Sequence, residues 1–102
     1  MVRHLVKHVV KLGHRRDFLA AAKALNAESA RLGLPRYRFW SAQFGTFNVI
    51  YGEGDYATAN DHLALLDAAA KDEAWAQVFR GFTGHLVDGL SEDTLVVEDD
   101  LG

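Results

Sequence analysis

The sequence predicts an α+β domain of the ferredoxin-like order βαββαβ, in which helices cover one face of an antiparallel four-stranded sheet. Apolar residues alternate with a period of two in four segments, as in strands, and recur every three or four residues in the segments between them, as in helices. The chain has 102 residues, 49% of them hydrophobic, which suits one modest core. We therefore expect a single domain over residues 1–102.

The first strand is expected over residues 2–12, where His4 and His8 share one face by the two-residue period. An alanine-rich amphipathic helix follows over residues 15–32. Gly33 stands just past the end of this helix, the position at which glycine most often terminates a helix.

A hairpin is expected in the aromatic central segment. Its strands are residues 36–44 and 47–53, joined by a tight turn at residues 45–46 (GT). Alternation along the first of these strands places Arg38 and Trp40 on the same face.

The second half of the chain supplies the remaining helices and the last strand. Asp55 is the expected N-cap of an amphipathic helix over residues 56–71, and Asp72 caps a second helical segment over residues 73–83. Residues 92–98 complete the sheet as its fourth strand.

The central strands are apolar on both faces. Trp40 and Phe44 lie on one face of the strand at 36–44, and Tyr37 and Phe39 lie on the other. Helices cover only one face of such a sheet, so the second face needs another cover. A second copy of the chain is the simplest one, and the sequence therefore predicts a homodimer with its sheets packed face to face.

Charge and composition argue against several classes of partner. The net charge is −3, with nine Lys or Arg in residues 1–40 and twelve Asp or Glu in residues 41–102. A net negative chain argues against a nucleic-acid partner, because a basic surplus supplies most of that affinity, although binding through the basic first strand is a distant alternative. No apolar run reaches 18 residues, so we expect no membrane span. The charged N-terminal segment predicts no signal peptide, and the absence of cysteine suits a cytoplasmic protein.

Several segments resemble the NIPSNAP-like proteins of the dimeric α+β barrel superfamily. They are residues 33–38 (GLPRYR), 44–49 (FGTFNV), 55–56 (DY) and 71–75 (KDEAW). The opening residues 2–6 (VRHLV) also resemble the first strand of the stress-responsive barrel group. The resemblance covers most of residues 2–98 and implies a ferredoxin-like sheet that forms a dimeric α+β barrel.

The resemblance implies several activities. The superfamily includes cofactor-free monooxygenases, haem-degrading enzymes, a polyketide cyclase, dehydratases and many members without a known role. The first strand offers His4 and His8 where the haem-degrading pattern has Asn, and the histidine pattern of the plant-type cyclase is missing, which argues against both of those activities. A cofactor-free oxygenase, cyclase or isomerase is the expected alternative, and no cofactor is expected.

His4 and His8 are the candidate catalytic residues, because imidazole exchanges protons near neutral pH. Four residues of strand separate them by about 13 Å, so they cannot share a metal ion, and we predict no metal site. The plainer interpretation is a pair of strand histidines whose nitrogens are satisfied by neighbouring groups.

Four further residues are candidate ligand-binding groups: Arg38, Trp40, Tyr51 and Trp75. A guanidinium beside an indole suits a planar acid, and a tyrosine hydroxyl can donate to a ligand carbonyl. Trp75 belongs to an aromatic stripe at helical spacing, which forms either core or a lid over an apolar pocket.

Two functions of different classes fit these observations. In the first, a small, largely apolar or aromatic ligand binds between sheet and helices; His4 or His8 moves a proton while Arg38 and Tyr51 orient an oxygen. In the second, the chain is a non-catalytic homodimeric interaction module, whose histidines and arginines make structural hydrogen bonds. A sizeable cavity lined by His4, His8 or Trp40 would favour the first.

Overall fold

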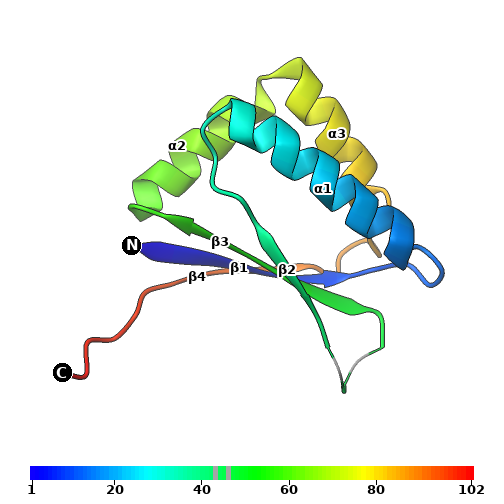
Figure 1. Cartoon of the computed structure of the whole chain (residues 1–102), viewed down its shortest axis with the longest axis horizontal. Coiled ribbons are helices and arrows are strands. Elements are labelled where there is room, and N and C mark those ends of the chain that lie inside the picture. Colours follow the sequence, from blue (N-terminus) through cyan, green and yellow to red (C-terminus); the bar gives the residue numbers. More distant parts are fainter. Residues whose placement is uncertain (43, 46) are drawn as a thin grey trace.

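The structure is a computed structural model that describes residues 1–42, 44–45 and 47–102. Its elements in chain order are β1 (Val2–Val9), α1 (Arg15–Arg31), β2 (Arg38–Ser41), β3 (Val49–Tyr56), α2 (Ala59–Ala70), α3 (Glu73–Thr83) and β4 (Glu92–Val96). The four strands form one sheet in the order β2-β3-β1-β4, with every neighbouring pair antiparallel. All three helices lie on the same side of this sheet (Figure 1). The predicted α+β ferredoxin-like class is confirmed.

Two predicted helix boundaries are confirmed: the end of α1 before Gly33 and the start of α3 after Asp72. Gly33 follows the C-cap of α1 with φ of 80°, in the left-handed region that glycine tolerates. Asp72 caps α3, since its carboxylate accepts a hydrogen bond from the Trp75 backbone N–H at 3.0 Å.

The N-cap predicted at Asp55 is wrong. β3 continues through Tyr56, so Asp55 pairs with Arg3 of β1, whose Nε donates to the Asp55 carboxylate at 2.7 Å. Thr58 caps α2 instead, its hydroxyl oxygen accepting from the Asp61 backbone N–H at 3.1 Å. Asp55 is a residue type that often caps helices, but here its carboxylate is bound by Arg3, which lies far away in the sequence.

The strands also differ in length from their predicted ranges. β1 ends at Val9 and β4 at Val96, while β2 begins only at Arg38 because the side chain of Asn26 holds the backbone N–H and C=O of Tyr37 at 2.9 Å each. Part of the predicted hairpin, at Gln43 and Thr46, lies outside the described residues.

Two glycines of β3 make room for aromatic rings on the helix side of the sheet. Gly54 is the partner of His4 in the strand pairing, and Gly52 is the partner of Val6. A Cβ added to Gly54 would lie 2.5 Å from the ring of Tyr37, and one added to Gly52 would lie 3.2 Å from the ring of Phe39. The rings therefore lie directly on the backbone of β3. A side chain in place of either glycine would occupy the space of the ring.

The main core lies between these rings and the helices. Its buried members are Val10, Phe18, Ala22, Ile50 and Phe82. A second buried cluster, of Leu34, Ala69 and Trp75, joins the three helices at the other end. Within the described residues no helix has both the length and the apolar character needed to cross a bilayer.

Gly54 and Gly81 have different surroundings, so replacing each with alanine should have opposite effects on stability. Gly54→Ala should lower the free energy of unfolding by about 1–3 kcal/mol, because the new methyl group collides with Tyr37. Gly81→Ala, in α3 with no neighbouring atom within 4 Å, should raise it by up to about 1 kcal/mol. Urea denaturation of both variants measures the two effects. A Gly54→Ala protein as stable as wild type would contradict the close packing of the Tyr37 ring on Gly54.

Candidate functional site

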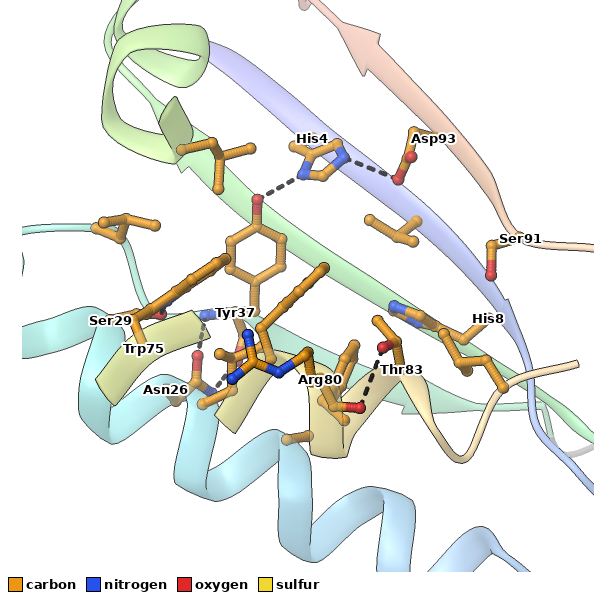
Figure 2. Close-up of a pocket in the computed structure, with 18 of the residues that line it drawn as sticks. His4, His8, Asn26, Ser29, Tyr37, Trp75, Arg80, Thr83, Ser91 and Asp93 are labelled. Carbon is orange, nitrogen blue, oxygen red and sulfur yellow. Dashed lines mark hydrogen bonds and ion pairs between the residues drawn. The ribbon is translucent and has the colours of Figure 1, made fainter. Parts of the chain in front are cut away.

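A cavity of about 520 Å³ lies between the sheet and helices α1 and α3 (Figure 2). This volume is within the range of pockets that hold small organic molecules. Most of its wall is apolar, and its large apolar side chains include Leu25, Phe39, Leu66, Trp75, Phe79 and Phe82. The polar groups form only a small part of the wall surface and come from different elements, which is typical of sites that orient an apolar ligand.

His4 is the centre of a hydrogen-bonded chain on the strand side of the cavity. Its Nε2 lies 3.1 Å from the Asp93 carboxylate of β4, and its Nδ1 is hydrogen-bonded to the Tyr37 hydroxyl (Figure 2). The hydroxyl groups of Tyr37 and Tyr56 are 2.9 Å apart. Because a carboxylate only accepts, a neutral His4 carries its proton on Nε2 and accepts a hydrogen bond from the Tyr37 hydroxyl at Nδ1.

Burial sets the protonation of the two phenols in this chain. It raises the pKa of Tyr37 well above its ordinary value, and the neighbouring Tyr56 hydroxyl raises it further. Burial also raises the pKa of Tyr56. Both hydroxyls therefore hold their protons at neutral pH, so Tyr56 donates to Tyr37 and Tyr37 donates to His4.

His62 of α2 packs behind this chain as an aromatic neighbour. Its ring centroid lies 4.6 Å from that of His4 and 4.8 Å from that of Tyr56. Both of its ring nitrogens are buried without a hydrogen-bond partner in the described part of the chain. Burial lowers the pKa of His62, and the nearby His4 lowers it further. Both effects favour the neutral imidazole, which packs against the rings of His4 and Tyr56.

His8 occupies a separate, drier position deeper along β1. Its Nδ1–H donates to the Ile50 carbonyl at 3.1 Å, and its ring lies among those of Phe18, Phe39 and Phe82. Since Nδ1 is the donor, Nε2 carries the lone pair. Burial lowers the pKa of His8, which keeps the ring neutral at pH 7.

Trp75 is at once a core residue and a wall of the cavity. Its indole N–H donates to the buried Ser29 hydroxyl at 2.9 Å, which ties α3 to α1. Its ring stacks on Phe79 with a centroid distance of 4.9 Å and an interplanar angle of 10°. Among the candidates from the sequence, His4, His8 and Trp75 are the three that the fold brings to this cavity.

Arg38, Trp40 and Tyr51 lie on the opposite face of the sheet. Trp40 pairs directly with Tyr51, and the Glu53 carboxylate accepts from Arg38 at 2.8 Å and from the Trp40 indole at 3.1 Å. The expectation that Arg38 and Tyr51 orient a ligand beside His4 is wrong. The register of β2 on β3 sends their side chains away from the helices, and the sequence alone does not give this register.

Sequence reasoning missed several polar residues of the cavity, among them Tyr37, Asp93 and Arg80. Alternation along the aromatic strand separates Tyr37 from Arg38, and this signal would have found Tyr37 once the helix-facing side was known. Asp93 meets His4 across 89 residues of sequence, which no local pattern reveals. No set of three or more His, Asp or Glu suited to a metal ion occurs in the part of the chain that the structure describes.

Comparison with known proteins identifies the fold. No family model matches the sequence, and no curated protein matches it. Among solved structures, an uncharacterised NIPSNAP-domain protein from Burkholderia xenovorans superposes with a TM-score of 0.83 at 17% identity, covering 100% of this chain and 98% of that one. The fold is NIPSNAP-like. A NIPSNAP family protein from Agrobacterium tumefaciens gives 0.81 at 15% identity, over 99% of this chain and 88% of its own.

The chain also has a fold similar to that of a protein described as an antibiotic biosynthesis monooxygenase. It matches with a TM-score of 0.67 at 14% identity, over 100% of both chains. Identities this low establish a shared fold and leave the activity to be argued from the site itself.

The lowered pKa of His8 predicts a pH-dependent stability. Below its ordinary value of 6.5 the unfolded chain takes up a proton at this position that the folded chain does not, so acid favours unfolding. The free energy of unfolding should therefore fall between pH 7.5 and pH 5, with a slope of up to about 1.4 kcal/mol per pH unit from this residue.

His8→Gln cannot titrate and should show a shallower fall over the same range. Urea denaturation at several pH values measures both slopes, and His62→Gln serves as an independent comparison because burial lowers that pKa as well. Parallel curves for wild type and His8→Gln would contradict the assignment of His8 as a buried neutral histidine.

Proposed function

We propose that this protein binds a small, largely apolar or aromatic ligand in the cavity between its sheet and its helices. The observation that carries the proposal is the cavity itself, about 520 Å³ with aromatic walls and a short polar chain along one side. A non-catalytic interaction module does not require a cavity of this size, and the side chains of protein interiors normally pack at the density of organic crystals.

We propose that the ligand is also a substrate, in a cofactor-free oxygenation by dioxygen, cyclisation or isomerisation. The relay of Asp93, His4 and Tyr37 supports this, because a carboxylate that orients an imidazole beside a hydroxyl is a general device for moving protons. A ligand proton would pass to the Tyr37 oxygen while the phenolic proton moves to Nδ1 of His4. The fold shared with a protein described as a monooxygenase is consistent with such chemistry.

A bulky substitution inside the cavity tests ligand binding. N-phenyl-1-naphthylamine, a neutral probe that fluoresces in apolar surroundings, should bind the wild-type protein. Ala76→Trp fills the space beside α3 and should weaken this binding at least about tenfold. The matched control is Ala64→Trp on the exposed side of α2. Equal binding by wild type and Ala76→Trp would favour the alternative function, a homodimeric interaction module without a ligand.

We propose, second, that the open face of the sheet forms a homodimer. Leu5, Trp40 and Tyr51 on this face are 37%, 57% and 45% exposed, which is unusual for large apolar side chains in a monomer. The charges around them already pair within the chain, Arg3 with Asp55 and Arg38 with Glu53, so a second copy would meet little net charge.

Light scattering at micromolar concentration should therefore give the mass of a dimer. Trp40→Lys should give a monomer, because a lysine can still pair with Glu53 on a free surface but is costly to bury at an interface. Leu63→Lys, an equally drastic change on exposed α2, should stay dimeric. A wild-type monomer at this concentration would overturn the proposal.

We propose a cytoplasmic location for the protein, which the absence of cysteine from its sequence supports. Its net negative charge gives no support for a nucleic-acid partner.

A further inference from the structure

We propose that the ligand of this cavity is an organic acid: an apolar or aromatic molecule whose carboxylate is bound by Arg80. This inference rests on the proposed ligand binding and specifies the chemical class of the ligand. It follows from the charges on the cavity wall and from their positions on opposite sides of the space.

Arg80 is the one Lys or Arg among the described residues that line the cavity. The other charged group on the wall, the carboxylate of Asp93, is already hydrogen-bonded to His4. No acid lies within salt-bridge distance of Arg80 in the described part of the chain, whereas Arg38 on the other face of the sheet lies 2.8 Å from the Glu53 carboxylate. Arg80 is exposed to solvent and also lines the cavity, so an anionic ligand could reach its guanidinium and become the partner of this charge.

The position of Arg80 on α3 suits this role. Ala76, Arg80 and Thr83 follow one another at helical spacing and all line the cavity, beside the stacked rings of Trp75 and Phe79. The Thr83 hydroxyl donates to the Arg80 carbonyl at 3.2 Å, so it is not available to donate to an anion, and the guanidinium is the charged donor on this wall. A guanidinium offers two parallel N–H groups that match a carboxylate.

Arg80 lines the same cavity as the groups proposed to act on the ligand. Figure 2 shows Arg80 on α3, across the drawn residues from His4 and Asp93 on the strands. A ligand held by its acid group at Arg80 would thus extend over the aromatic wall toward Tyr37 and His4. The acid sets the orientation, and the far end of the ligand meets the proton relay.

Two probes that differ by a single anionic group test this inference. They are N-phenyl-1-naphthylamine and its sulfonated counterpart 1-anilinonaphthalene-8-sulfonate, titrated by fluorescence. Arg80→Gln should weaken binding of the sulfonate about ten- to hundredfold, the usual effect of losing a charge-assisted hydrogen bond, and change binding of the neutral probe less than about twofold. Arg80→Lys should restore part of the loss. The matched control Arg16→Gln removes an exposed charge from α1, away from the cavity, and should change neither probe.

The outcomes separate the two proposals. If wild type binds both probes and Arg80→Gln weakens neither, or weakens both equally while Arg80→Lys restores nothing, the acidic ligand is excluded and the cavity proposal stands. If wild type binds neither probe, ligand binding itself is overturned, and the inference about Arg80 with it. Displacement of the sulfonate by 2-naphthoic acid, but not by 2-naphthamide, is the result expected for a carboxylate ligand.

Discussion

Direct contact between aromatic rings and a strand backbone is the constraint on which the rest of this structure depends. Gly52 and Gly54 let Phe39 and Tyr37 lie on β3, at the level where side chains would otherwise project. Tyr37 thereby reaches His4 on the next strand, and Phe39 closes against His8. The same two glycines thus determine both the packing of the aromatic core and the position of the hydroxyl beside the cavity.

The order of elements could be predicted from the sequence because it depends on local patterns. The two-residue period in β1, the glycine after α1 and the Asp72 cap of α3 all act within a few residues. The N-cap at Asp55 could not be judged in this way. Its carboxylate is engaged by Arg3, 52 residues away, and a long-range ion pair has no signature in the neighbouring sequence.

The candidate site was predictable only in part, for the same reason. His4 and His8 stand out because they are histidines on an otherwise apolar face of the first strand, and the structure brings both to the cavity. Arg38, Trp40 and Tyr51 also stand out, yet they belong to the other side of the sheet because one residue of register reverses the direction of a side chain. Tyr37 and Asp93 gain their significance only from the folded arrangement around His4.

The two tryptophans of the chain lie in very different surroundings. The indole of Trp75 is buried beside the cavity with its N–H bonded to Ser29, whereas that of Trp40 is more than half exposed on the open face of the sheet. Indole emission shifts to shorter wavelength as its surroundings become drier. The protein therefore carries two intrinsic optical reporters, one beside the interior space and one on the outer surface, and each can be read separately after replacing the other with phenylalanine.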